Sequence, residues 1–436
     1  MKPFGTSQEC LAALPARSLL WRQVGLLSLL APLMLAACGG GGAPADTGPS
    51  AQESALRPPP APPAPTPVPP PATPPTADAR FAVGDQLFHE PRLSASGRLS
   101  CASCHAATNG HADPAGTFLP LGGPSHDQQG ARSSPSLRYL DNAGAFRINA
   151  QGQALGGLTW DGRANSRSEQ ARSPLFAANE MANASVEDFA ARLRSTPAWN
   201  ALLSAYNLRA TATPAQLLAA TQDALARYQA DDEEFHAFNS KFDEVQAGRA
   251  SFTAAEQRGL NAFNDPQRGN CASCHTSRGA RPLFTNFEYH ALGVPRNSSV
   301  ATQTPAFFDL GLCGPQRTDL ASQTEQCGRF KVPTLRNVAL SAPYFHNARF
   351  NTLEEVVRFY ATRDTNPAAW YPTVNGQVQR FNDLPLQYQA NVERRPPFGQ
   401  QAGQRPRLSE QDITDIVAFL RTLNDAPPPP ASATGG

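Results

Sequence analysis

The pentapeptide Cys-Ala-Ser-Cys-His occurs twice in this sequence, at residues 101–105 and 271–275. Two thiols with this spacing on one helical turn can add to the two vinyl groups of a porphyrin, and the histidine that follows can bind its iron. Zinc ribbons also use paired Cys-x-x-Cys motifs, but those pairs usually lie closer together, and redox dithiols usually lie in a βαβ setting. The sequence therefore predicts two covalent c-type haems, held by Cys101, Cys104 and His105 and by Cys271, Cys274 and His275.

The elements that position these motifs are predicted to be helices. Thr213-Pro214 begins one helix, with proline in its first turn, and residues 253–256 form a capping box that leads towards the second motif. Another capping box, at residues 352–355, precedes an amphipathic segment, and residues 413–420 form a last one. Alternation typical of strands is scarce. The pattern therefore predicts an all-α fold with few or no strands.

The repeated motif also predicts a repeated domain. Gly84–Phe88 precedes the first motif and Gly259–Phe263 precedes the second, and both consist of glycine, three residues and phenylalanine. Before a haem motif, this pattern resembles the first helix of a cytochrome c domain. We therefore predict two tandem cytochrome c-like domains, at residues 79–250 and 251–425, each holding one covalent haem.

The N-terminal segment has the composition of a targeting signal. Residues 1–38 combine basic residues, a short apolar run and the sequence Leu-Ala-Ala-Cys, which resembles a bacterial lipobox. We predict a lipoprotein signal peptide in which Cys38 carries lipid; the alternative is an ordinary cleaved signal with an incidental cysteine. The predicted location is the periplasmic side of a bacterial membrane, with the chain anchored to the membrane and not spanning it.

Two further segments have compositions that do not favour folding. Residues 39–78 are rich in proline, glycine and alanine and are predicted to be a disordered linker, and residues 426–436 a disordered tail. The 37 basic and 36 acidic residues give a net charge of +1, so the composition indicates no nucleic-acid partner. Cys313 and Cys327 lie outside the haem motifs, and in an oxidising compartment we expect them to form a disulfide, with two free thiols as the alternative.

Two other segments resemble a known family. Residues 158–181 contain Trp-Asp-Gly-Arg and Glu-Met, and residues 330–360 contain Pro-Thr-Leu-Arg-Asn and Pro-Tyr-Phe-His. Together with the paired haem motifs, they closely resemble the bacterial di-haem cytochrome c peroxidase family, including its MauG-type branch. The resemblance extends over nearly the whole body of the chain.

The resemblance implies that the first haem is the site of peroxide reduction. Gln170 and Glu180 match the distal-pocket pair, Trp160 matches a relay between the haems, and Pro174 and Met181 match neighbours of that pocket. A carboxylate above the iron can move a proton between the two peroxide oxygens and so promote cleavage of their bond. Without the resemblance, Trp160 would be interpreted as a core aromatic residue and Glu180 as a solvated residue at a helix end.

The second haem is implied to be the one where electrons enter or charge is shared. Peroxidases of the family have a methionine fourteen residues after the histidine of Pro-Tyr-Phe-His, and counting from His346 this position is Tyr360. Tyrosine is typical of the MauG branch, with histidine and tyrosine ligands, and a phenolate lowers the iron potential where a thioether raises it. The alternative is that Tyr360 only completes the apolar face of its helix.

Two features of the family are altered here. Peroxidases that need reductive activation have a removable distal histidine after the first motif, but Gly123 fits that position best, with His126 a few residues away and His111 a weaker candidate. We therefore expect an open or water-bound first haem, with His126 as a sixth ligand as the alternative. The family also holds calcium, and the matching positions are Ser133, where asparagine is usual, and the carbonyls of Ser341 and Pro343.

The resemblance implies an enzyme that reduces hydrogen peroxide to water with electrons from a small periplasmic cytochrome c or cupredoxin. The alternative is a MauG-type oxidase, which uses peroxide to oxidise a partner protein or an organic substrate through a high-valent di-haem state. A plain electron carrier is a third hypothesis, but it would have no use for the acid Glu180. Homodimers are common among relatives, although the sequence identifies no interface.

Overall fold

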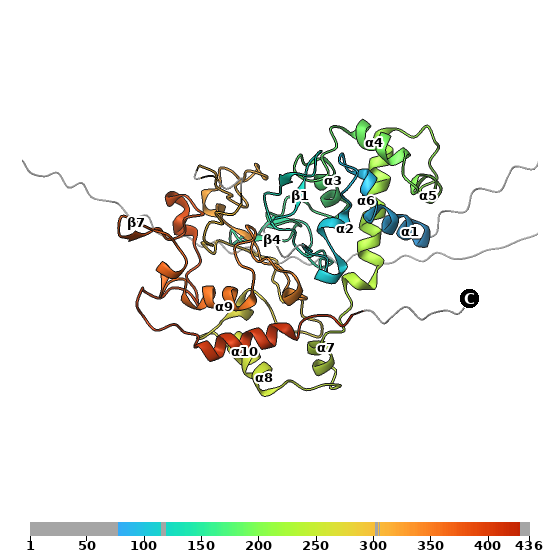
Figure 1. Cartoon of the computed structure of the whole chain (residues 1–436). Helices are drawn as coiled ribbons and strands as arrows, with labels where there is room; N and C mark the ends of the chain where they lie inside the picture. Colours follow the sequence, from blue (N-terminus) through green and yellow to red (C-terminus); the bar gives the residue numbers. More distant parts are fainter. Residues whose placement is uncertain (1–76, 115–118, 301–303, 305, 428–436) are drawn as a thin grey trace, which may run out of the picture. The chain divides into compact units, whose positions relative to one another are not determined.

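The computed structural model describes residues 77–114, 119–300, 304 and 306–427, which belong to one compact unit of the chain (Figure 1). The predicted signal peptide, Cys38 and nearly all of the predicted linker and tail lie outside the described residues. None of the described helices is long and apolar enough to cross a membrane.

Helices joined by long loops dominate the described residues, as predicted (Figure 1). The α-helices are α1 (Ala77–Phe88), α2 (Cys101–Cys104), α3 (Arg167–Phe176), α4 (Val186–Arg194), α5 (Trp199–Ala205), α6 (Pro214–Asp231), α7 (Lys241–Gln246), α8 (Ala254–Asn264), α9 (Leu353–Thr362) and α10 (Glu410–Arg421). The 3₁₀ helices are η1 (Pro91–Leu93), η2 (Ala107–Asn109), η3 (Glu233–Phe235), η4 (Cys271–Ser273), η5 (Thr324–Gln326), η6 (Val338–Leu340), η7 (Pro367–Ala369) and η8 (Leu386–Asn391).

The strands among the described residues are short and form antiparallel pairs. These pairs are β1 (Leu121–Gly122) with β2 (Gln128–Gln129), β3 (Arg147–Ile148) with β4 (Ala154–Leu155), β5 (Tyr289–His290) with β6 (Phe330–Lys331), and β7 (Thr373–Val374) with β8 (Gln377–Val378). Each strand is only two residues long, so no extended sheet contributes to the core.

The predicted helix starts are confirmed by their caps. The hydroxyls of Thr213, Thr253 and Thr352 each accept a hydrogen bond from the third residue of the following helix, in capping boxes that begin α6, α8 and α9. The amphipathic segment at residues 413–420 lies in α10, which Ser409 caps in the same way. These local signals therefore fix where the long helices begin.

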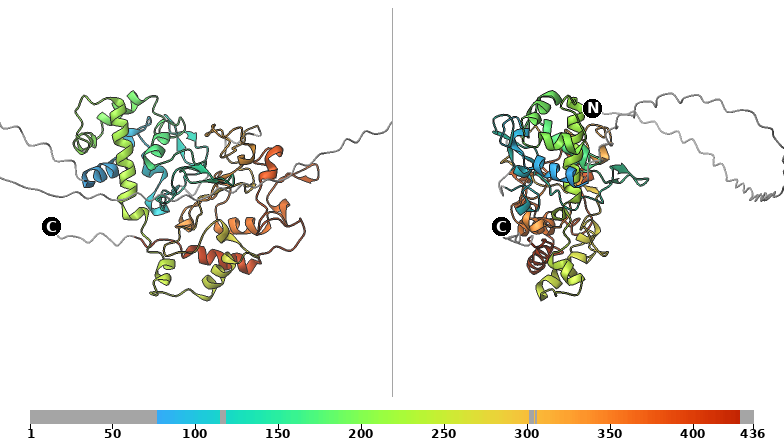
Figure 2. Two further views of the ribbon diagram at one scale, coloured as in Figure 1. Left: turned by 180° about the vertical axis from the view of Figure 1, so that it is seen from behind. Right: turned by 90° about the vertical axis from the view of Figure 1, so that its right-hand side faces the viewer.

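A crossing pair of helices accompanies each haem motif: α1 packs on α6, and α8 packs on α10 (Figures 1 and 2). A Cβ atom on Gly84 would lie 2.1 Å from the carbonyl oxygen of Ala224, and one on Gly259 would lie 1.9 Å from that of Asp415. No side chain fits at either place, so glycine allows the two backbones of each pair to touch. This close approach is the physical reason for the glycine in the repeated pattern.

Separate apolar clusters surround the two helix pairs. The first cluster takes residues from α1 and from α3 to α6, and it includes Phe88 and Phe189. The second takes residues from α7 to α10, and it includes Phe263 and Phe419. Each pair of helices therefore has its own core.

The predicted disulfide between Cys313 and Cys327 is present. It closes a loop with a sequence separation of 14 residues, for which the restriction of the unfolded chain contributes about 3 kcal/mol. The disulfide thus restrains residues 313–327, a segment with little regular secondary structure.

Candidate active site

Each Cys-Ala-Ser-Cys-His segment lines a large cavity. The empty space is about 1190 Å³ at the first and about 1550 Å³ at the second, solvent at the mouths included. The first cavity is lined by the predicted residues Cys101, Cys104, His105, Ser133, Trp160, Gln170, Pro174, Glu180 and Met181. The second is lined by Cys271, Cys274, His275, Trp160 and Tyr360. Each cavity therefore brings the two cysteines and the histidine of one motif together with residues from distant segments of the chain.

The two motif histidines are held in the same way. The Nδ1 atom of His105 lies 3.0 Å from the carbonyl oxygen of His111, and that of His275 lies 2.9 Å from the carbonyl oxygen of Phe284. Because a carbonyl can only accept, Nδ1 carries the hydrogen and the lone pair of Nε2 stays free for a metal. Burial lowers the pKa of both histidines to about 4, so both are neutral at pH 7, as an iron ligand must be.

The motif cysteines do not have the character of a redox dithiol. Burial raises the pKa of Cys101, Cys104 and Cys271 to about 12, whereas reactive dithiols have lowered pKa values. In the described ranges, no three His, Cys, Asp or Glu side chains gather to hold a metal ion, which also disfavours a zinc site. The cavities, neutral histidines and paired thiols together fit covalently attached porphyrins.

The wall of the first cavity also carries an acid, Glu180. Gln170 lies on α3, which Ser166 caps, and Glu180 lies in the turn that follows this helix. The Glu180 carboxyl is accessible because it lines the cavity, but the protein around it raises its pKa by burial, opposed by the charge of Arg163. Glu180 is therefore suited to hold a proton at its carboxyl group.

The predicted distal-histidine candidates both lie away from this acid. His126 lies in the turn between β1 and β2, outside the set of described residues that line the first cavity. The same hairpin is tied to the acid's own backbone, because the Gly123 amide donates to the Glu180 carbonyl at 2.8 Å. His111 lies on the His105 side of the cavity, where its ring stacks on Phe235 at 4.1 Å.

Trp160 lines both cavities. Its indole Nε1 donates to the Ser133 carbonyl at 2.8 Å, and its own carbonyl accepts from the Lys331 amide at 2.9 Å. The Lys331 amine donates to the Gly157 carbonyl at 2.7 Å, and burial lowers its pKa to about 7. The tryptophan is thus fixed between the two cavities from both sides.

A buried ion-pair network, which the sequence analysis missed, lies beside Trp160. The Arg132 guanidinium donates to Asp161 at 2.7 Å and to Asp309 at 2.6 and 2.7 Å. Burial alone would raise the pKa of both carboxyls, but the charge of Arg132 outweighs it and holds both pKa values below their usual range. Arg132 lines the first cavity and Asp309 the second, so the network connects their walls.

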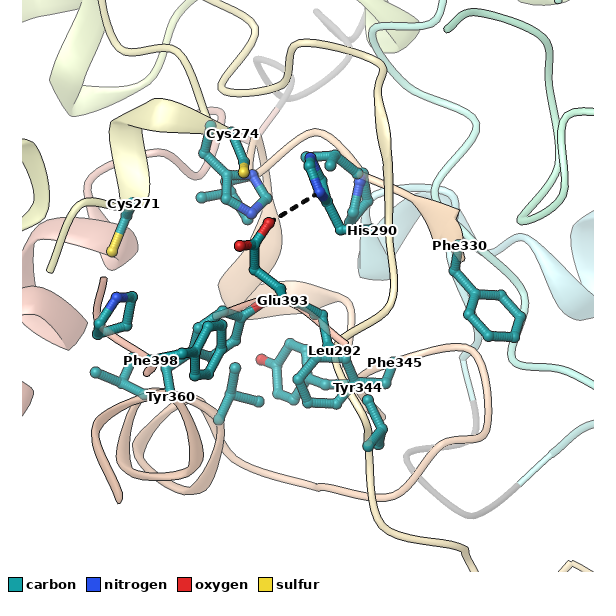
Figure 3. Close-up of a pocket in the computed structure, with 18 of the residues that line it drawn as sticks. Cys271, Cys274, His290, Leu292, Phe330, Tyr344, Phe345, Tyr360, Glu393 and Phe398 are labelled. Atoms are coloured by element: carbon teal, nitrogen blue, oxygen red, sulfur yellow. Dashed lines mark ion pairs between the residues drawn. The ribbon is translucent and has the colours of Figure 1, made fainter. Parts of the chain in front are cut away.

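Tyr360 lies on α9 and faces the second cavity between two aromatic rings (Figure 3). The ring of Phe345 stacks at 6.1 Å and the ring of Phe398 at 5.3 Å between centroids. No hydrogen bond to the Tyr360 hydroxyl is found among the described residues, and burial raises its pKa. A cation in the cavity would give this oxygen the partner that the protein does not.

A second charged cluster missed from the sequence lies at the edge of the second cavity (Figure 3). The His290 ring lies 3.2 Å from Glu288 and 3.3 Å from Glu393. Burial alone would lower the pKa of His290, but hydrogen bonds to Cys274, Glu288 and Glu393 raise it to about 11. His290 is therefore a cation at neutral pH. The Arg395 guanidinium also forms an ion pair with the Glu393 carboxylate, at 2.6 Å.

The three expected calcium positions lie in neighbouring segments. The Ser133 hydroxyl donates to the Phe345 carbonyl at 2.7 Å and its amide to the His346 carbonyl at 2.9 Å, shortly after Ser341 and Pro343 in sequence. No acidic cluster accompanies them among the described residues, so a calcium ion would depend on hydroxyl, carbonyl and water oxygens.

Comparison with known proteins agrees with this arrangement of two cavities, each lined by one haem motif. The family described as di-haem cytochrome c peroxidase matches residues 78–251. The methylamine utilization protein MauG of Paracoccus denitrificans is 35% identical over 366 residues, which cover 80% of this chain and 89% of that protein. The cytochrome c551 peroxidase of Nitrosomonas europaea is 30% identical over 317 residues, covering 70% and 82%.

A solved structure has the same architecture. The diheme peroxidase BthA from Burkholderia thailandensis is 36% identical, with a TM-score of 0.72 over 80% of this chain and 86% of that chain. The cavities and these likenesses define a di-haem oxidoreductase. The chain belongs to the di-haem cytochrome c peroxidase family, which confirms the resemblance seen in the sequence, and it is an enzyme of the cytochrome-c peroxidase type.

Proposed function

We propose that this protein reduces hydrogen peroxide to water at the first cavity, with electrons from a small periplasmic cytochrome c or cupredoxin. The observation that supports this most directly is Glu180, an acid of raised pKa that lines the same cavity as His105. Peroxide gains two electrons and two protons to become two water molecules, and two donor proteins each lose one electron. Bound haem would supply the iron chemistry and the path for these electrons.

The chain's own residues have distinct roles in this proposal. The Glu180 carboxyl takes a proton from one peroxide oxygen and returns it to the other, which makes a water molecule the leaving group. Gln170, on the neighbouring helix, orients the peroxide by its amide. Trp160, held by its Nε1 hydrogen bond, mediates between the two cavities.

The haem ligands and domains follow from the same proposal. Residues 79–250 and 251–425 each form a cytochrome c domain, and each holds one covalent haem on its cysteine pair. His105 and His275 are the proximal ligands, and Tyr360 is the second ligand of the second iron. The first iron is open or water-bound, and a calcium ion bound near Ser133, Ser341 and Pro343 completes the set.

The location is also part of the proposal. A lipid on Cys38 anchors the chain to the periplasmic side of a bacterial membrane, which brings it to periplasmic donors. Incorporation of labelled fatty acid should be lost in a Cys38→Ser variant. Retained label would contradict the anchor and leave the enzymatic proposal unaffected.

A direct test is to mix the haem-loaded protein with hydrogen peroxide and a reduced small cytochrome c. We expect repeated turnover, with two donors oxidised for each peroxide consumed. Mass analysis of the intact chain should find two covalently attached haems. An unreactive protein with both irons fully ligated would support a plain electron carrier.

Tyr360 favours a second candidate, a MauG-type oxidase that uses peroxide to oxidise a partner protein or an organic substrate. In that case peroxide should produce a long-lived change in the absorption spectrum while the donor cytochrome is hardly oxidised. The same mixing experiment therefore distinguishes the two functions.

A further inference from the structure

The mouth of the second cavity is walled by two chain segments that are bound together. Most residues of the segments 269–275 and 393–398 line this cavity, although Ala272 and Arg394 do not, and the Asn270 side-chain amide donates to the Pro396 carbonyl at 3.0 Å. The neighbouring loop joins them, because Arg407 donates to the Gln267 carbonyl at 3.4 Å. The segments are therefore one continuous surface around the cavity mouth.

This surface carries an excess of arginine. We refer to three exposed arginines of the loop as the basic rim: Arg394, Arg405 and Arg407. None of the three forms an ion pair with any described residue, whereas the nearby Arg268 and Arg395 are paired with Asp412 and Glu393. Because the whole chain has a net charge of only +1, the basic rim is a local concentration of positive charge.

The loop of residues 394–407 is held against the cavity mouth by its own hydrogen bonds. The Gln400 side chain donates to the Arg405 carbonyl at 2.7 Å and accepts from the Arg407 amide at 3.2 Å. The guanidinium of Arg395 lies 3.5 Å from the ring of His290, and both residues line the second cavity together with Cys274. The arginines therefore stand on a structured loop beside the attachment cysteine.

The two attachment segments differ in their exposure. Ser273, between the two cysteines of the second motif, is exposed, whereas the corresponding Ser103 of the first is partly buried and hydrogen-bonded to Ser100. The attachment segment of the second cavity therefore opens to solvent beside the basic rim. A redox partner needs this combination: access to the cofactor edge and charge to orient it.

We propose that the basic rim is the docking surface for a small electron-carrier protein with an acidic face. The inference rests on the proposed function, in which the second cavity receives electrons. Each docking event passes one electron from the donor to the second site, so two events supply one peroxide. Opposite charges speed the encounter of the two proteins and are screened by salt, which gives a fast, transient complex.

The test compares charge-reversal variants of the haem-loaded, full-length protein. Arg394→Glu/Arg407→Glu reverses two positions of the basic rim, and Arg209→Glu reverses an exposed arginine between α5 and α6 as the matched control. Stopped-flow mixing gives the second-order rate constant for oxidation of an acidic and of a basic cytochrome c at several salt concentrations. Equilibrium binding of each cytochrome, measured without peroxide, gives a readout independent of turnover.

For the unaltered protein, we expect faster oxidation and tighter binding of the acidic cytochrome, both weakened by salt. The double variant should lose at least about tenfold in rate at low salt, with a flatter salt dependence, whereas the control keeps the original rate. A preference for the basic cytochrome, or an unaltered rate in the double variant, would overturn the proposal.

Two other outcomes are decisive in different ways. If binding of the acidic cytochrome is weakened by the double variant but no donor is ever oxidised, the docking surface stands and the proposed function fails. If the double variant binds vesicles of phosphatidylglycerol more weakly than the control while donor binding is unchanged, the basic rim contacts anionic lipid and not a protein.

Discussion

The two cavities begin from the same five residues but differ in the other residues of their walls. In both, a buried, neutral imidazole is fixed by a backbone carbonyl, that of His111 for His105 and that of Phe284 for His275. The wall of the first cavity includes the carboxyl of Glu180. The second cavity has a tyrosine between two aromatic rings (Figure 3). The pentapeptide thus determines only the proximal half of each site, and distant segments give each site its chemistry.

In the proposed function, this difference between the cavities separates proton transfer at the first site from charge storage at the second. An acid with a raised pKa is useful where protons move, and Glu180 has this property in the first cavity. In the second cavity, the rings of Phe345 and Phe398 hold the Tyr360 ring between them, so its hydroxyl oxygen stays in one place, as a permanent ligand requires.

Replacing the acid of the first cavity should have the largest effect. Glu180→Gln keeps the shape but removes the group that moves a proton, so we expect peroxide turnover to fall by about 10²–10⁴-fold. Steady-state oxidation of a reduced cytochrome c measures the change. Glu187→Gln, at an exposed position on α4, is the control and should keep full activity. Similar activities in both variants would remove the acid from the mechanism.

Removing Arg132, which links the walls of the two cavities, should strongly lower the free energy of unfolding. Arg132→Leu leaves Asp309, 4% exposed, without its cation, while Asp161, 0% exposed, keeps only Arg163; this should reduce the free energy of unfolding by about 3–5 kcal/mol. Denaturant unfolding at pH 7 measures this loss. Arg249→Leu removes an exposed ion pair with Glu244 and, because solvent screens this pair, should change the stability far less.

The same network predicts a pH dependence. Both carboxyls have folded pKa values below the ordinary value of 3.8, so their contribution is complete above pH 3.8 and is lost as the pH falls through the folded values. Stability of the unaltered protein should therefore fall more steeply below pH 3.8 than that of Arg132→Leu. Parallel curves for the two proteins would show that the network does not stabilise the fold.

Changing the clamped tyrosine should alter only the second site. Tyr360→Met replaces a phenolate by a thioether, which should raise the potential of the second iron on the order of 100 mV, within the range of about 0.8 V spanned by haem axial ligands. Potentiometric titration followed by EPR spectroscopy measures both irons. Tyr344→Phe, in the same cavity, is the control, because the Tyr344 hydroxyl already donates to the Val338 carbonyl at 3.0 Å. An unchanged potential in Tyr360→Met would exclude this residue as a ligand.

The sequence predicted what local chemistry determines. The cysteine spacing indicated the residues around which the two cavities form, and the proline after Thr213 and the capping boxes at Thr253 and Thr352 marked the helix starts. It missed groups that only the folded chain assembles. Arg132 and Asp309 are 177 residues apart in sequence, and neither position carries a short motif. The same holds for Phe398, which reaches Tyr360 from a loop far along the chain.

The repeated glycine connects a pattern in the sequence with the packing of the helices. A glycine four residues before a phenylalanine is a weak signal, and its meaning is clear only from the partner helix. Ala224 and Asp415 supply the carbonyl oxygens that exclude a side chain at Gly84 and Gly259. The sequence therefore indicated equivalent positions, and the packing of the helices explains why they are equivalent.

The smallest effect is expected from replacing His126, the candidate sixth ligand of the first iron. If His126 bound the first iron, both irons would have two protein ligands and the asymmetry of the sites would disappear. Its hairpin is instead held by the Gly123 amide on the Glu180 carbonyl, and a Cβ atom on Gly122 would lie 2.2 Å from the Asn179 carbonyl oxygen. This close packing leaves His126 in the turn, outside the lining of the cavity.

We therefore expect His126→Gln to leave the spin state of the first iron and the peroxide turnover unchanged. Low-temperature EPR of the oxidised protein, recorded before and after reduction and reoxidation, measures the spin state in both proteins. A low-spin signal in the unaltered protein that becomes high-spin in His126→Gln would identify this histidine as a ligand. The hairpin would then have to separate from the Glu180 turn in that state, because the Gly123 hydrogen bond holds the two together.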